Sequence, residues 1–164
     1  MDCAFTINEE WFRYRAAAII IENGCVLMAK NDLDDFYYSV GGAVKLHESA
    51  EEAVKREVLE ETGIKYEIDK LAFIHECFYK GYYYDNKNLK CHEIAFYFLM
   101  KSKGNQALND NSYVYNGVRE HMCWLPIQKL NDYKLFPVFF KEKLLHISEK
   151  IVHIKTEEYE RHMP

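Results

Sequence analysis

Three glutamates, Glu57, Glu60 and Glu61, stand at intervals that place them on neighbouring positions of one predicted helix. At about 100° per residue, Glu57 and Glu61 fall inside the apolar arc that an amphipathic helix buries, and Glu60 falls on its border. Carboxylates at these spacings repel one another, more strongly once they leave water. A divalent cation offsets that repulsion, because Mg²⁺ and Mn²⁺ prefer oxygen ligands. The glutamates therefore predict a metal site; the alternative is a solvated acidic face of a surface helix.

The residues around these carboxylates predict the helix itself. Ser49 followed three residues later by Glu52 is typical of a capping box, and Gly63 stands where a left-handed C-cap is expected. No proline or glycine interrupts the residues between them. Arg56 lies one turn before Glu60, so we expect the two to pair. The acidic residues should therefore sit on a well-capped helix.

A glycine pair, Gly41 and Gly42, comes shortly before this helix. Glycines allow positive φ and let the backbone approach a ligand closely, although such a pair also marks ordinary tight turns. Next to an acidic helix we expect the pair to shape the site, with backbone carbonyls as further metal ligands. A metal beside such a turn suits phosphoryl or nucleotidyl transfer, because it neutralises phosphate charge and activates water.

The segment 42–64 resembles the Nudix box. The match consists of Gly42, Glu48 and the run Arg56-Glu57-Val58-Leu59-Glu60-Glu61-Thr62-Gly63-Ile64 at the spacing of that motif. The resemblance implies an α/β fold, the Nudix-type α/β/α sandwich with a mixed β-sheet. It also implies hydrolysis of a nucleoside diphosphate linked to another moiety X.

Two positions next to the motif depart from the usual pattern. Val40 stands where the family usually has proline, and His47 stands where it often has glycine. These departures affect the detail of the loop but leave the carboxylates in place.

The resemblance further implies roles for individual residues. Glu57, Glu60 and Glu61 would bind Mg²⁺, with Mn²⁺ as a substitute. Arg56 would orient Glu60 by a salt bridge, and Glu48 would support the loop or join an outer metal shell. Glu60, Glu57 and Arg56 are thus predicted catalytic residues.

A general base should lie within reach of the attacking water. We rank Glu120 first, because it precedes the tryptophan of the last predicted strand at a loop edge that family members often use. Glu93, Glu76 and the helix carboxylates are alternatives, and each is otherwise a surface carboxylate. The pair His92-Glu93 resembles a subgroup assigned to ADP-ribose or related nucleotide diphosphates. The histidines are expected to be hydrogen-bonded strand or surface residues: His75, His92 and His121.

Substrate contacts are predicted at Arg15, Gly41, Gly42 and Tyr82. Arg15, at the start of the first long strand, would reach a substrate phosphate, with a solvated edge charge as the alternative and Arg13 as the second choice. The tyrosines of one loop are candidates for stacking on a nucleobase or for ordinary packing: Tyr82, Tyr83 and Tyr84.

The remaining pattern predicts the elements that position this site. Strands are expected at 14–21, 25–30, 36–40, 71–80, 91–101 and 113–124, after a lead-in strand or arm over 1–13. Asn23-Gly24 predicts a hairpin between the first two strands, and a long tip joins 71–80 to 91–101. Short helices are expected at 126–130 and 138–149, followed by a tail, 150–164, without an assigned role. This order suggests a mixed sheet covered by helices.

Length and composition narrow the class of protein. The 164 residues, 49% of them hydrophobic, suit one domain over 1–164. A net charge of −5 without a basic stripe gives no reason to expect a nucleic-acid polymer as partner, whereas a bound metal would still admit a nucleotide. The five cysteines form no C-x-x-C pair, which favours reduced thiols and a cytoplasmic location. No signal peptide or membrane span is expected.

The leading hypothesis is a Mg²⁺-dependent Nudix pyrophosphohydrolase acting on a small nucleotide. Substrates like ADP-ribose and nucleoside triphosphates stay equally open. One alternative is a non-catalytic nucleotide sensor on the same fold, and a second is a Nudix-like isomerase, which needs a reactive cysteine that the sequence does not identify. A homodimer is also allowed, because family members commonly pair.

Overall fold

The computed structural model describes residues 1–82, 86–109, 112–115 and 117–159. Its strands are β1 (Ala4–Ile7), β2 (Glu10–Ile19), β3 (Ile21–Glu22), β4 (Cys25–Asn31), β5 (Tyr37–Ser39), β6 (Gly41–Ala43), β7 (Ile68–Lys80), β8 (Lys90–Met100), β9 (Ser112–Tyr115), β10 (Val118–Pro126), β11 (Leu135–Phe136) and β12 (Val152–Glu158). Its helices are α1 (Ala50–Thr62), the 3₁₀ helix η1 (Ile127–Asp132) and α2 (Phe140–Lys143).

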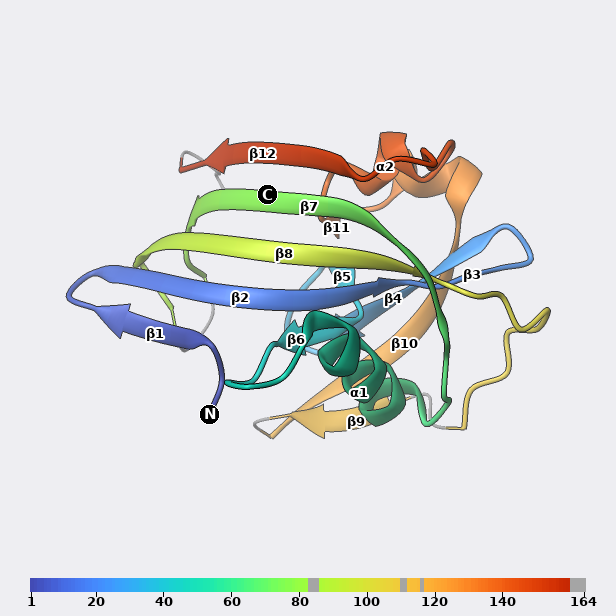
Figure 1. Ribbon diagram of the computed structural model, residues 1–164, viewed down its shortest axis with the longest axis horizontal. Coiled ribbons are helices and arrows are strands. Elements are labelled where there is room, and N and C mark those ends of the chain that lie inside the picture. Colours follow the sequence, from blue (N-terminus) through green and yellow to red (C-terminus); the bar gives the residue numbers. More distant parts are fainter. Residues whose placement is uncertain (83–85, 110–111, 116, 160–164) are drawn as a thin grey trace.

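The strands form two mixed sheets (Figure 1). The first has the order β1-β2-β8-β7-β12, with β6 paired to β2 beyond the end of β1. Within it β2 and β8 run parallel, β7 and β8 antiparallel, and β12 and β7 parallel. The second sheet has the order β11-β5-β4-β10-β9, with β3 paired to β4. The predicted α/β class is confirmed, with two mixed sheets where the sequence predicted one.

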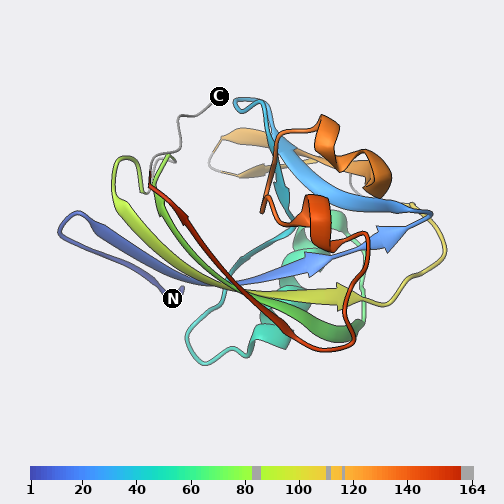
Figure 2. The ribbon, with the colours of Figure 1, turned by 90° about the horizontal axis from the view of Figure 1, so that it is seen from above.

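Two hydrophobic clusters lie on opposite faces of these strands. On β2, Ala16 and Ala18 belong to the cluster that includes the buried side of α1, whereas Ala17 and Ile19 belong to the other. Phe140 of α2 is fully buried in that second cluster. Figure 2 shows α1 on one side of the strands and η1 with α2 on the other. The strands are therefore the middle layer between helices, because alternate side chains of each strand point to opposite faces.

Both predicted hairpins are present. Asn23 and Gly24 have φ of 51° and 73°, and β3 pairs with β4 across them. β7 and β8 form the long antiparallel pair. The single strand predicted at 113–124 is wrong, because β9 and β10 pair with each other around Gly117, whose φ is 77°. Asn-Gly at 116–117 was a hairpin signal, although Asn116 lies outside the described residues.

The helix predicted over 138–149 is also wrong, since α2 covers only Phe140–Lys143. No side chain caps its start, and His146, Ile147 and Ser148 are weaker helix formers than alanine or leucine. Lys70 also donates a hydrogen bond to the Ser148 carbonyl at 2.9 Å, which holds this segment against β7. The helix predicted at 126–130 appears as η1.

The tail without an assigned role contains β12. Its residues pair in parallel with β7 from Val152↔Phe73 to Glu158↔Tyr79. The tail therefore supplies a strand to the first sheet, up to the last described residue, 159.

Candidate active site

Helix α1 begins and ends as its sequence predicts. The Ser49 hydroxyl accepts the Glu52 amide N–H at 3.2 Å, and the Glu52 carboxylate accepts the Ser49 amide N–H at 2.8 Å. Gly63 adopts the left-handed conformation with φ of 68°. Since both ends of the helix are capped, the orientation of its acidic face is fixed.

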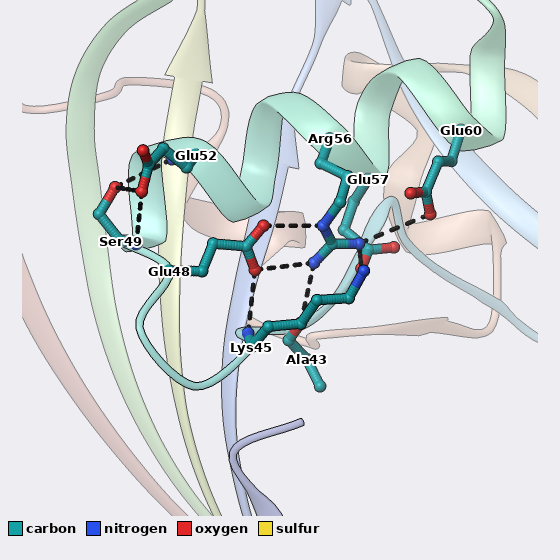
Figure 3. Close-up of polar contacts among 8 residues, drawn as sticks. All are labelled: Ala43, Lys45, Glu48, Ser49, Glu52, Arg56, Glu57 and Glu60. Carbon is teal, nitrogen blue, oxygen red and sulfur yellow. Dashed lines mark hydrogen bonds and ion pairs between the residues drawn. The ribbon is translucent and has the colours of Figure 1, made fainter. Parts of the chain in front are cut away.

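Arg56 joins the helix to the loop before it (Figure 3). Its guanidinium donates to the two carboxylate oxygens of Glu48 at 2.8 and 3.0 Å, to Glu57 at 2.5 Å and to the Ala43 carbonyl at 3.2 Å. Glu60 lies 3.5 Å from the guanidinium, so the predicted ion pair is present but is the longest of its contacts. Arg56 therefore positions Glu57 and the loop more closely than it positions Glu60.

The Glu57 carboxylate lies directly over Gly42. A methyl group at Gly42 would stand 2.5 and 2.7 Å from the two carboxylate oxygens. Burial raises the pKa of the Glu57 carboxyl, whereas the hydrogen bond and charge of Arg56 lower it. The glycine thus makes room for a half-buried carboxylate against the backbone.

Glu61 is buried, with 6% of its surface exposed. Its carboxylate accepts the Gly41 amide N–H at 3.2 Å. Burial raises the pKa of this carboxyl well above its usual value, and the negative charge of Glu57 raises it further, while Arg15 acts in the opposite direction. The sequence prediction that Glu61 occupies the apolar flank of the helix is confirmed, whereas 57% of the Glu60 side chain is exposed.

Arg15 holds the turn that carries the glycines. One of its terminal nitrogens donates to the Ser39 carbonyl at 2.7 Å and to the Gly41 carbonyl at 3.1 Å. Its positive charge lowers the pKa of both Glu57 and Glu61 against the effect of burial. Arg15 therefore lies close to the carboxylates, with its hydrogen bonds directed at the backbone.

Glu120 lies on β10 of the second sheet. It pairs in register with Asn31 on β10 and β4, and its negative charge contributes to the raised pKa of Glu61. Of the predicted bases on β7 and β8, Glu76 accepts from His153 at 2.8 Å and Glu93 forms an ion pair with Arg13. Glu120 is the candidate base that the fold couples to the helix carboxylates.

The histidines have other partners. His75 hydrogen-bonds Thr156 at 2.8 Å, and His121 lies 2.6 Å from Asp32. The ring of His92 stacks on Phe78 with centroids 4.3 Å apart.

Tyr82 is half-buried just beyond the end of β7. The register places that end of the hairpin beside Glu10, at the opposite end of β2 from the glycines. The other two tyrosines of the prediction, Tyr83 and Tyr84, lie outside the described residues.

The carboxylates have the chemistry that a divalent cation prefers, but they are not arranged as a complete coordination site. Within the described ranges, no group of three or more His, Cys, Asp or Glu side chains is already arranged to hold a metal ion. Glu57 and Glu61 nevertheless place two carboxyl groups near each other at low exposure, and a hard cation with oxygen ligands would stabilise their ionised forms. The exposed Glu60 side chain is free of close packing and can turn toward such an ion.

Sequence reasoning missed the partner of Arg13. Arg13 and Glu93 are register partners on β2 and β8, and the Arg13 Nε donates to the Glu93 carboxylate at 2.7 Å. The guanidinium also lies over the Trp11 ring, 5.1 Å from its centroid. The alternation of Trp11, Arg13 and Arg15 along one strand was the available signal, but their partner on β8 depends on the register.

A family model described as NUDIX domain matches residues 12–145. Comparison with curated proteins gives no match. No helix in the described part of the chain combines the length and apolar character that a membrane span needs.

Similar folds occur among solved structures at low sequence identity. A MutT protein from Bacillus halodurans has a TM-score of 0.70 at 18% identity, covering 90% of this chain and 91% of that one. A MutT protein from Methanosarcina mazei Go1 has a TM-score of 0.58 at 20% identity, covering 80% and 88%. An ADP-ribose pyrophosphatase from Streptococcus suis has a TM-score of 0.55 at 13% identity, covering 88% and 98%. At these identities the likeness concerns the fold.

Proposed function

The chain belongs to the Nudix family, and we propose that it is a pyrophosphohydrolase that cleaves the diphosphate linkage of a small nucleotide with the help of Mg²⁺. The observation that carries this proposal is the placement of Glu57 and Glu61 beside the glycine turn. The Glu57 carboxylate is half-buried and the Glu61 carboxylate is buried. Burial disfavours the ionised form of each, so a positive charge nearby would stabilise it. A structural role alone gives no reason to hold two like charges there.

In this proposal Glu57, Glu60 and Glu61 hold the cation, with Mn²⁺ as a substitute for Mg²⁺. When bound, the metal neutralises charge on the phosphate oxygens and lowers the pKa of a bound water. Arg56 fixes the Glu57 carboxylate through its 2.5 Å hydrogen bond, and the Gly41 N–H fixes Glu61. These contacts supply a preorganised site, which raises the rate because less rearrangement is needed at the moment of reaction.

Glu120 is proposed as the general base. It lies on β10, and its negative charge contributes to the raised pKa of Glu61. A carboxylate oxygen of Glu120 would accept the proton of the attacking water, which then adds to one phosphorus of the diphosphate. Two phosphorylated products leave. The substrate contacts predicted at Arg15, Gly41, Gly42 and Tyr82 stay predictions.

The proposal also concerns the class of nucleotide that the protein cleaves. The solved structures with this fold include MutT proteins and an ADP-ribose pyrophosphatase. We therefore keep both ADP-ribose-like compounds and nucleoside triphosphates as substrates.

The test incubates the protein with ADP-ribose and with the common nucleoside triphosphates, with and without Mg²⁺, and identifies the products by mass. We expect Mg²⁺-dependent release of a nucleoside monophosphate. Glu51→Gln is a matched control, because Glu51 is exposed in the first turn of the same helix. Nucleotide binding without cleavage would favour the sensor, and conversion without loss of the diphosphate would favour the isomerase.

Location and assembly stay proposals of the same kind. Five free cysteines support a reducing cytoplasm, and a homodimer stays a prediction that sedimentation of the purified protein would test.

A further inference from the structure

Arg13 and Arg15 point to the same face of the first sheet. They share this face of β2 with Ala17 and Ile19, which pack into the cluster on the side opposite α1. Side chains two residues apart on a strand are about 7 Å apart along it. The two guanidinium groups therefore lie one after the other along β2, with Arg13 farther from the glycine turn than Arg15. Their surroundings differ.

Arg15 is occupied by the backbone. Its terminal nitrogen donates to both Ser39 and Gly41 carbonyls, and Gly41 in turn donates its N–H to Glu61. The Arg15 Nε is buried, so it is not exposed to solvent, and it has no hydrogen-bond partner among the described residues. Arg15, Gly41 and Glu61 thus form one chain of contacts that sets the position of a proposed metal ligand.

Arg13 is anchored by side chains instead. Its Nε and one terminal nitrogen are directed at a single oxygen of Glu93, and its flat face lies on Trp11. Glu93 is buried, with 8% of its side chain exposed, whereas 27% of the Arg13 side chain is exposed. The guanidinium is therefore held by Glu93 and Trp11, while part of the Arg13 side chain remains exposed.

We propose that the two arginines have different roles: Arg15 is a positioning residue for the glycine turn and Glu61, and Arg13 is the arginine that binds substrate. The ligand of Arg13 is a phosphate of the nucleotide on the side of the cleaved linkage away from α1. A fixed guanidinium edge matches two phosphate oxygens at once, which an ammonium group does not. This proposal rests on the proposed function and revises the role predicted for Arg15.

The test compares kinetic constants of variants at the two positions, with ADP-ribose as substrate. Removing Arg13 alone would leave Glu93 buried and unpaired, so the informative variant replaces both residues, Arg13→Met with Glu93→Leu. We expect KM to rise about 10- to 100-fold with kcat within about threefold of wild type, because a charge-assisted hydrogen bond is lost. Arg13→Lys should recover only part of the affinity. Lys129→Gln, on the exposed surface of η1, is the control.

Arg15→Met should give the opposite pattern. We expect kcat to fall about 10- to 100-fold and the Mn²⁺ dissociation constant to rise, while KM changes little, because the displaced turn moves a metal ligand rather than a substrate contact. Arg15→Lys should restore part of the turnover. A rise in KM from Arg15→Met with none from the Arg13 pair of substitutions would overturn the assignment, as would equal losses from both.

Binding measurements separate this inference from the proposed function. Calorimetric titration with AMP in EDTA reads the Arg13 contact without any turnover, and titration with Mn²⁺ alone reads the Arg15 contact. If wild-type protein hydrolyses nothing, the proposed function fails, and the titrations still decide the roles of the arginines. Unchanged AMP affinity in the Arg13 and Glu93 double variant would refute the binding role.

Discussion

Gly42→Ala is the substitution that separates the chemistry of the site from the stability of the fold. Gly42 does not have a positive φ, so alanine fits the backbone conformation without strain. The three atoms nearest to the added methyl group would be those of the Glu57 carboxyl group, at 2.5 to 2.7 Å. Ordinary contact begins at 3.4 Å, so this carboxylate must move by roughly 1 Å.

The expected consequence is a large loss of activity with little loss of stability. The carboxylate is the end of a flexible side chain and can turn away, and alanine restricts the unfolded chain, so we expect the free energy of unfolding to change by less than about 1 kcal/mol. A displacement of this size at a proposed metal ligand should lower kcat/KM about 100-fold. The affinity for Mn²⁺ should fall about 10- to 100-fold.

The assay combines Mg²⁺-dependent turnover, Mn²⁺ titration and urea unfolding. Gly41→Ala is the contrasting variant, because its φ is 135° and its added methyl group would meet the Ala16 carbonyl, so it should lose stability as well as activity. Gly104→Ala controls for stability alone, since Gly104 has φ of 77° and open space around it. Wild-type turnover and metal affinity in Gly42→Ala would refute the reasoning that places Glu57 in the metal site.

Three further outcomes are expected. Glu61→Gln and Glu60→Gln should each abolish most turnover with the fold intact, and Glu61→Gln should keep or raise stability in EDTA, since burial opposes ionisation of this carboxyl; circular dichroism and melting curves check the fold. Excess Mg²⁺ should raise the melting temperature of the wild type and EDTA should abolish activity; a melting temperature indifferent to Mg²⁺ would speak against the site. Glu22→Gln should destabilise the protein by about 1–3 kcal/mol, since the carboxylate accepts from Ser102, Lys103 and Gly104. Burial raises the pKa of the Glu22 carboxyl, but these donors outweigh burial and hold the pKa below its usual value. The stabilisation from Glu22 is therefore complete above the usual carboxyl pKa and is lost as pH falls through the lower folded-state value. Urea unfolding at several pH values should show a larger loss of stability in wild type than in Glu22→Gln.

The local parts of the site were predictable because their signals are contained in a few neighbouring residues. Ser49 with Glu52 and the glycine at 63 specify the ends of α1 through hydrogen bonds that form within the segment. The helical period then places Glu61 on the buried flank without knowledge of the fold.

Contacts between distant strands were not predictable in the same way. The pairing of Arg13 with Glu93 depends on the register of β2 with β8, and a shift of one residue would turn either side chain to the other face. The hydrogen bonds of Arg15 depend on β6 running beside β2, which the sequence suggested only as a turn. The extra helix expected at 138–149 failed because apolar spacing there reflects packing of Phe140 and Leu144 into a core, and not a continuous helix.

The position of β12 has a consequence for handling the protein. By covering one side of β7, a strand of 13 residues, it turns the long backbone edge of that strand inward. β12 is itself an edge strand in the described sheet, and it carries charged side chains of both signs, such as Lys155 and Glu157. Charged residues on an edge strand disfavour pairing with a strand of another chain. A variant truncated before Val152 would leave β7 as an exposed edge strand. We expect such a variant to aggregate in solution rather than to have a lower catalytic rate.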